Sequence, residues 1–238
     1  MAMPVMHECP SITCENRQHV INTTPCIQQP IHMTCHSPTQ ELETLHLPGA
    51  ELQFLPALFT AEEADALLHP LLHDTPWRQD TLLLYGKPTA VPRLQAWYGD
   101  AGSHYRYSGL RLHPLPWTST LLHIKTRVEQ HSAGTVFNSV LLNCYRHERD
   151  SVSWHSDDEP ELGTAPVIAS VSLGAPRLFQ LRHRQQRHLK YHLTLPHGSL
   201  LLMRGNTQHH WQHQLPKSRV PTPARVNLTF RTVRTEVK

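Results

Sequence analysis

The sequence predicts a mainly β domain with flanking helices and a double-stranded β-helix core, which is a jelly-roll-like arrangement. Two helical patterns are followed by short apolar segments bounded by turn residues, at 166–173, 178–181, 191–195 and 199–203. A last segment, 224–231, alternates polar and apolar residues with the period of a half-buried strand. Many short strands after two helices favour two packed sheets with the helices on one side.

The chain of 238 residues divides into an extension, residues 1–45, and a domain, residues 46–238. The extension combines Pro, Thr, Gln, His and Cys with little periodicity, which is typical of disorder. Four of the five cysteines lie in it, at Cys9, Cys14, Cys26 and Cys35. A zinc module is the alternative, although no C-x-x-C spacing occurs. The domain keeps only Cys144, which favours a reducing compartment.

Two absent patterns favour a cytoplasmic protein, or a nuclear one if the source is eukaryotic. The N-terminus lacks the basic start and apolar run of a signal peptide. No stretch approaches the ~20 apolar residues that cross a bilayer. We therefore expect no membrane partner, and we expect a monomer.

Two helices are predicted in the first half of the domain. Residues 60–63, Thr-Ala-Glu-Glu, form a capping box that opens a helix to about His73. The second runs from Pro116 to about Ser132, with Gly134 ending it. Both carry an apolar stripe suited to packing on a sheet, formed by Leu67, Leu68, Leu71 and Leu72 in the first and by Leu121, Ile124 and Val128 in the second.

An apolar segment, 52–58, precedes the first helix. Between the two helices lie a second apolar segment and a stretch rich in aromatic residues. Residues 82–88 are apolar and stop in a turn that contains Tyr85, which on its own is an ordinary turn residue. Residues 91–110 contain Trp97, Tyr98, Tyr105 and Tyr107. Such a cluster suits a base by stacking and cation–π attraction. Packing in the core is the alternative, above all for Trp97 and Tyr98.

Positive charge is concentrated in the second half of the chain. The net charge is +3, but from residue 164 onward there are twelve Lys or Arg and one acid, Glu236. Residues 182–190 read as a hairpin tip, and such runs are most often solvated loops. Together with a second basic loop they favour contact with phosphates, through Arg182, Arg184, Arg187, Lys190, Lys217 and Arg219.

The candidate metal ligands begin with the H-x-D pair His155 and Asp157. On extended backbone, side chains two residues apart point to the same side, so both can reach one ion. Two histidines and a carboxylate are the ligands of non-haem Fe(II) oxygenases. The pair alone is a weak signal in a chain with 20 His. His209, His210 and His213 are all candidates for the third ligand.

The segment 224–231 places four polar side chains, Arg225, Asn227, Thr229 and Arg231, on one face of a strand. Arginines that project into an interior need an anion, and a dicarboxylate would supply one. Asn143 and Tyr145, two apart on an apolar strand, would add hydrogen-bond donors. The alternative for either arginine alone is a solvated face that pairs with surface acids.

The joint pattern resembles the AlkB family of Fe(II)- and 2-oxoglutarate-dependent nucleic-acid dealkylases. Asn143-x-Tyr145, His155-x-Asp157, His213 and the alternating run from Arg225 to Arg231 occur in the family's order, and the resemblance extends from Leu52 to Val233. Further matching stretches are 168–174, 197–203 and 211–216. Residues 98–102 resemble the branch that contains the human duplex-DNA repair enzyme.

The resemblance implies a role for each matched residue. Fe(II) would be held by His155, Asp157 and His213, because family spacing selects His213 over the two neighbouring histidines. The distal carboxylate of 2-oxoglutarate would pair with Arg225, helped by Tyr145, and the rest would be steadied by Asn143, Asn227 and Arg231. With O2, the resemblance implies oxidative demethylation of 1-methyladenine or 3-methylcytosine in DNA, which is direct repair that yields succinate and formaldehyde.

The resemblance also implies contacts with the nucleic acid. Tyr107 would stack on the flipped base, with Tyr105 and Ser108 beside it. Glu159 would contact its exocyclic amine, the alternative being a solvated acid. Tyr85 would fill the space that the base vacates in a duplex, and Lys87 and Arg93 would join the basic residues on the DNA.

Two other functions stay open at this point. One is an RNA demethylase or protein hydroxylase of the same fold, against which the basic loops favour nucleic acid and the Tyr85 hairpin favours duplex DNA. The other is a DNA-binding protein without catalysis. All three ligand positions and both arginine positions carry competent residues, which favours an enzyme.

Overall fold

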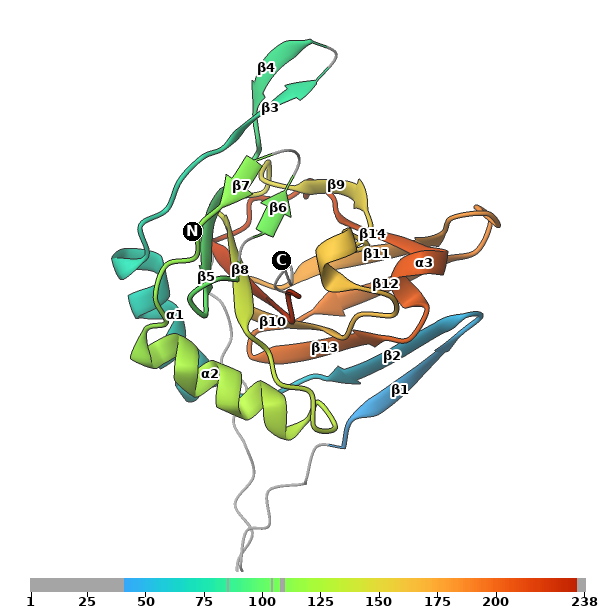
Figure 1. Cartoon of the computed structure of the whole chain (residues 1–238), viewed down its shortest axis with the longest axis horizontal. Coiled ribbons are helices and arrows are strands. Elements are labelled where there is room, and N and C mark those ends of the chain that lie inside the picture. The colour runs from blue at the N-terminus through green and yellow to red at the C-terminus, as the bar shows by residue number, and fades with distance from the viewer. Residues whose placement is uncertain (1–40, 85, 104, 108–109, 235–238) are drawn as a thin grey trace, which may run out of the picture. The chain divides into compact units, whose positions relative to one another are not determined.

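The computed structural model describes residues 41–84, 86–103, 105–107 and 110–234. Seven strands form the larger, major sheet, in the antiparallel order β1-β2-β13-β10-β15-β8-β5 (Figure 1). Their bounds, in that order, are Glu43–Leu47, Ala50–Leu55, Ser199–Arg204, Ile168–Gly174, Arg225–Arg231, Ser139–Tyr145 and Leu94–Gly99.

Four strands form a second, minor sheet in the order β12-β11-β14-β9, with bounds Lys190–Leu195, Arg177–His183, Trp211–Leu215 and Val152–His155. All its pairs are antiparallel. The two sheets pack face to face through buried side chains from both, including Trp97, Leu181 and Met203. This arrangement confirms the predicted jelly-roll-like core.

Two helices cover the major sheet on the side away from the minor sheet (Figure 1). α1 (Ala61–Asp74) begins with the predicted capping box: Thr60 Oγ1 accepts from Glu63 N at 3.2 Å, and Glu63 Oε2 accepts from Thr60 N at 2.9 Å. α2 (Ser119–Gln130) begins three residues later than predicted, because Thr118 supplies its N-cap by accepting from Leu121 N.

The alternation of β15 divides the interior into two parts. Val226, Leu228 and Phe230 pack with the helices in one core. The polar residues between them, beginning with Arg225 and ending with Arg231, face the space between the sheets. The predicted assignment of the two faces is therefore correct, and a row of polar side chains lies inside the protein.

Two hairpins stand apart from the sheets, β3 (Thr81–Leu84) with β4 (Lys87–Ala90) and β6 (Tyr105–Tyr107) with β7 (Leu110–Leu112). A 3-10 helix, η1 (Pro160–Leu162), and a single helical turn, α3 (Thr207–His210), were not predicted. None of the helices in the described ranges has the length and apolar character needed to cross a membrane.

The domain begins earlier than predicted. β1 starts at Glu43 and pairs along its whole length with β2, so the expected boundary at residue 46 falls inside a strand. The described residues from 41 to 234 belong to one compact unit. Residues 1–40 lie outside the described ranges, and both the disordered extension and its zinc alternative stay predictions.

Candidate active site

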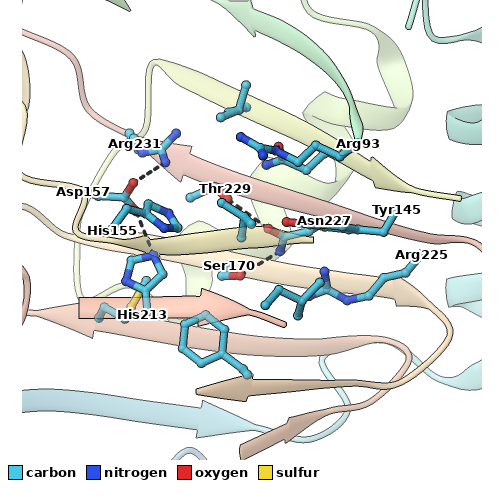
Figure 2. A pocket seen from close by; sticks show the side chains of 16 residues that line it. Arg93, Tyr145, His155, Asp157, Ser170, His213, Arg225, Asn227, Thr229 and Arg231 are labelled. Atoms are coloured by element: carbon cyan, nitrogen blue, oxygen red, sulfur yellow. Dashed lines mark hydrogen bonds and ion pairs between the residues drawn. The ribbon is translucent and has the colours of Figure 1, made fainter. Parts of the chain in front are cut away.

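Three side chains converge between the sheets, where the end of β9 pairs with the middle of β14. His155 and His213 are direct cross-strand partners, with ring centroids 4.3 Å apart. Asp157 lies two residues beyond the end of β9, and the ligand atoms of all three residues lie within 4.8 Å of one another (Figure 2). In the described ranges no other group of three His, Cys, Asp or Glu is arranged this way. His209 and His210 lie in α3 and do not belong to the group.

Hydrogen bonds direct the ligand atoms of this triad toward a common point. His155 Nδ1 lies 2.8 Å from the carbonyl of Ser153, so a proton on Nδ1 leaves the Nε2 lone pair for a metal. Arg231 Nη2 donates to Asp157 Oδ1 at 2.6 Å. The other carboxylate oxygen, Oδ2, lies 3.9 Å from His213 Nε2. One oxygen is therefore held by Arg231 and the other faces the histidines.

The protonation states suit a divalent metal. Burial alone would raise the pKa of Asp157, but Arg231 and the two histidines outweigh it and lower the pKa to about 2. Burial and the neighbouring His155 lower the pKa of His213 to about 3. Burial also lowers the pKa of His155, against the opposing charge of Asp157. A carboxylate and two neutral imidazoles are the forms that bind a metal ion.

A buried cation lies at the other end of the same cavity. Arg225 is 2% exposed, donates from Nη2 to Ser172 Oγ at 2.8 Å, and lies 5.3 Å from the ring centre of Tyr145. Burial lowers its pKa to about 10, against the effect of Tyr145, so it stays charged at neutral pH. Its Nε is buried with no hydrogen-bond partner in the described ranges. A carboxylate would satisfy both the charge and this donor.

Asn143 lies between these two ends and is held by two donors. Its Oδ1 accepts from Arg93 Nε at 2.8 Å and from Gln95 Nε2 at 3.1 Å. The amide nitrogen of Asn143 is thereby left for other contacts in the cavity. Arg93, expected on the DNA, is 4% exposed and lines this cavity. Its assignment to the DNA surface is therefore corrected: it contributes to the interior of the site.

Two serines, Ser170 and Ser172, had no role assigned from the sequence, and both accept hydrogen bonds from side chains of β15. Asn227, a predicted co-substrate residue, donates to Ser170 Oγ at 2.8 Å and to the carbonyl of Val171 at 2.9 Å. Ser170 and Ser172 alternate with apolar residues on β10, directly opposite Thr229 and Asn227 of β15. This alternation of serines with apolar residues is visible in the sequence and could have indicated that both serines face the cavity side of the strand. Figure 2 shows the cavity that runs from the triad past Asn227 to Arg225.

A second cavity, of about 200 Å³, shares a wall with the first. Both are lined by Arg93, Val152 and His155. The second one is otherwise lined mainly by apolar side chains of the β3–β4 hairpin region and by Trp154. It therefore leaves space with mainly apolar walls beside the candidate metal ligand His155.

The residues expected at the base are placed only in part. Tyr105 and Tyr107 lie on β6, whose backbone pairs with β7, but their side chains are outside the description. Ser108 and Tyr85 lie outside the described residues altogether. Glu159 is half-buried and precedes η1, where its carbonyl accepts from Leu162 N at 2.9 Å.

The residues expected on the DNA backbone fall into two groups. The first group has exposed side chains and consists of Lys87, Arg187, Lys190, Lys217 and Arg219. Two others are engaged within the protein. Arg184 forms a 2.7 Å ion pair with Asp158. Arg182 donates twice to Gln212 Oε1, at 3.0 and 2.8 Å, and lies 4.3 Å over the ring of Trp154.

Comparison with known proteins identifies the family. The profile of the 2OG-Fe(II) oxygenase superfamily matches residues 51–231. The human protein named alpha-ketoglutarate-dependent dioxygenase alkB homolog 3 is 36% identical over 247 residues, covering 96% of this chain and 85% of its own. The mouse DNA oxidative demethylase ALKBH2 is 43% identical over 187 residues, covering 74% of this chain and 77% of its own. The chain spans 64% of the bovine alkB homolog 3.

Solved structures agree on the fold. The structure of OsALKBH1 matches with a TM-score of 0.53 at 16% identity, over 79% of this chain and all of that one. A 2OG-Fe(II) family oxidoreductase from Burkholderia pseudomallei matches with a TM-score of 0.52 at 14% identity, over 77% of this chain and 87% of that one. The chain belongs to the AlkB family of the 2OG-Fe(II) oxygenases, which implies Fe(II) as cofactor and 2-oxoglutarate and O2 as co-substrates.

Proposed function

We propose that this protein removes alkyl groups oxidatively from N-alkylated bases such as 1-methyladenine and 3-methylcytosine in DNA, and so repairs DNA directly. The observation that carries the proposal is the single cavity that joins the His155, Asp157 and His213 triad to the buried Arg225. Relatives named as DNA oxidative demethylases support the choice of substrate.

Fe(II) would be held by His155 Nε2, Asp157 Oδ2 and His213. The donor set fits this ion, because two imidazoles and one carboxylate leave positions open for the co-substrate and oxygen. When bound, the iron would supply the oxidation, in which 2-oxoglutarate loses CO2 and takes one atom of O2 to become succinate, and the other atom enters the alkyl carbon. The hydroxylated methyl carbon then leaves the base nitrogen as formaldehyde.

Arg225 would bind the distal carboxylate of 2-oxoglutarate. Its unpartnered Nε and its Nη2 lie on one edge of a planar guanidinium, which matches a carboxylate with two parallel hydrogen bonds. Tyr145 would support this carboxylate. Asn143, oriented by Arg93 and Gln95, would offer its amide nitrogen between the two ends. Asn227 would hold β15 in place, while Arg231 steadies Asp157.

The flipped base would enter beside His155, where the 200 Å³ cavity opens. Tyr107 would stack on it, with Tyr105 and Ser108 at its edge. A 1-methyladenine or 3-methylcytosine ring is cationic, so an aromatic partner and a carboxylate both favour it. Glu159 would supply that carboxylate near the exocyclic amine.

The DNA backbone would follow the exposed basic residues, Lys87, Arg187, Lys190, Lys217 and Arg219. Arg182 and Arg184 would contribute only by exchanging their present partners, Gln212 and Asp158, for phosphates. Tyr85 would occupy the gap that the base leaves in a duplex. The exposed Leu83 of the same hairpin is consistent with such a contact, because it is 74% accessible.

We infer as well that the protein acts as a monomer, in the cytoplasm or, in a eukaryote, the nucleus. The proposed substrate is found there, and the reducing conditions keep iron ferrous. The free, buried Cys144 is compatible with such conditions.

The proposal is tested by turnover on oligonucleotides that carry one 1-methyladenine or 3-methylcytosine, as single-stranded DNA, duplex DNA and RNA. Formaldehyde and succinate should appear in equal amounts on DNA and only when Fe(II) and 2-oxoglutarate are both added. Turnover confined to RNA would show that the protein is an RNA demethylase instead. Absence of formaldehyde from every methylated strand would contradict the proposal.

A further inference from the structure

The candidate ligand Asp157 lies outside any strand. β9 ends at His155, so the backbone of Asp157 receives no support from the ladder that pairs His155 with His213. Asp157 is 2% exposed, and its backbone N–H points into the protein. A buried N–H without an acceptor costs free energy comparable to a lost hydrogen bond.

The acceptor is the side chain of Gln208, fifty-one residues further along the chain. Gln208 Oε1 accepts from Asp157 N at 2.9 Å, and Gln208 is itself 2% exposed. The other end of the amide is used as well, because Nε2 donates to Met203 Sδ at 3.4 Å. These two contacts fix which end of the amide faces Asp157.

The residue before Asp157 is held by the same element. Ser156 Oγ donates to the carbonyl of Trp211 at 2.9 Å. Gln208 lies in α3 and Trp211 directly follows it, so this turn holds both residues that lead from β9 into the loop. The turn continues into β14, which carries His213.

The turn is anchored on its far side. Thr207 Oγ1 donates to the carbonyl of Arg204 at 2.6 Å and accepts from Glu51 N at 2.9 Å. Trp211 Nε1 donates to the carbonyl of Pro48 at 3.0 Å. Gln208 therefore projects from a support fixed to β13 and to the β1–β2 hairpin, and it can hold a loop in place.

We propose that Gln208 is a positioning residue of the metal site, which sets the place of Asp157 relative to His213. Arg231 draws one oxygen of the carboxylate toward itself at 2.6 Å. The hydrogen bond from Gln208 holds the backbone of Asp157 so that its second oxygen still faces the histidines. Without this hydrogen bond, the carboxylate of Asp157 can turn fully toward Arg231, and its second oxygen no longer faces His155 and His213.

The inference rests on the proposed metal ligands and not on the nucleic-acid substrate. Residues that orient metal ligands from behind typically contribute about 10-fold to 100-fold to metal affinity. The test variant is Gln208→Met, which keeps the length of the side chain and removes the acceptor. The matched control is Gln214→Met on β14, since Gln214 donates to Gln180 Oε1 at 2.6 Å and points away from the triad's face.

The experiment titrates Co(II) into metal-free full-length protein without DNA, and follows the visible absorption of the bound ion. Gln208→Met should bind Co(II) 10-fold to 100-fold more weakly than wild type and with altered absorption, while Gln214→Met stays within twofold. Both should keep the far-ultraviolet circular dichroism of wild type. Equal affinity of Gln208→Met and wild type would overturn the inference alone. No binding by wild type would overturn the ligand set together with it.

A second measurement does not depend on the variant folding. In metal-free wild-type protein, the Asp157 amide should exchange with deuterium at least about 100-fold more slowly than in an unfolded chain, because it has a buried acceptor. Exchange at the unfolded rate would overturn the inference.

Discussion

Arg231 donates to Asp157 Oδ1 at 2.6 Å, and both side chains are less than 5% exposed. The contact divides the carboxylate between two tasks, since Oδ1 meets the guanidinium and Oδ2 faces His213. It also keeps Asp157 ionised in an interior that would otherwise favour the neutral acid. The arginine at the end of the alternating strand therefore also holds the candidate metal ligand Asp157 in its ionised form.

Removing this cation should destabilise the fold. Arg231→Met leaves a buried carboxylate without its partner, and the free energy of unfolding in urea should fall by about 3–5 kcal/mol. The double variant Asp157→Asn with Arg231→Met removes the stranded charge, so it should lose clearly less. If both variants lose the same amount, or the single one loses under about 1 kcal/mol, the ion pair does not have this role.

Arg225 should control affinity for the co-substrate. Arg225→Met removes the buried cation, and the KM for 2-oxoglutarate should rise by about 30-fold to 1,000-fold, which corresponds to about 2–4 kcal/mol. Arg225→Lys keeps the charge but not the paired donors, so its KM for 2-oxoglutarate should lie between that of wild type and that of Arg225→Met. The exposed Arg219→Met serves as the control and should leave this KM unchanged. An unchanged KM in Arg225→Met would remove the residue from the co-substrate site.

Cys144 should resist alkylation in the native protein. Burial and, to a lesser degree, Asp150 raise the pKa of this thiol from 9.0 to about 11, so the reactive thiolate is about 100-fold scarcer at pH 8. Mass spectrometry of the peptide that contains Cys144 should show little iodoacetamide adduct in buffer and full reaction in urea. Rapid modification of the native protein would contradict its buried position.

Asp150 should make stability depend on acid. Burial would raise its pKa, but Arg146 overrides this through hydrogen bonds at 2.7 and 3.0 Å, so the pKa is lowered below 3.8. A carboxyl with a lowered pKa stabilises the fold above its unfolded pKa and loses this contribution as pH falls. The free energy of unfolding of wild type should therefore drop more steeply below pH 3.8 than that of Asp150→Asn. Parallel curves would contradict the pair.

One part of the site that the sequence could predict follows a period of two along a single strand. Arg225, Asn227 and Arg231 follow it, and the structure places all three in the cavity. Asn143 and Tyr145 lie directly opposite Asn227 and Arg225. Arg93, directly before β5, and Gln95 on that strand are also two residues apart, but the resemblance had placed Arg93 on the DNA.

Other features depend on contacts between distant residues. Gln208 accepts a hydrogen bond from Asp157 because α3 lies next to the loop after β9. No residue spacing in the sequence predicts this contact. The engagement of Arg184 by Asp158 is similar. A count of positive charges cannot distinguish a guanidinium that is already paired from one that awaits a phosphate, and so the basic patch is smaller than composition indicates.

His155, Asp157 and His213 should together hold one ferrous ion. Anaerobic Fe(II) titration of the three single alanine variants tests this, beside His209→Ala and His210→Ala, which change histidines outside the triad. Each triad variant should lose Fe(II) affinity by at least about 100-fold and stop producing succinate, while both controls bind as wild type does. Wild-type Fe(II) affinity in His213→Ala or in His155→Ala would contradict this ligand set.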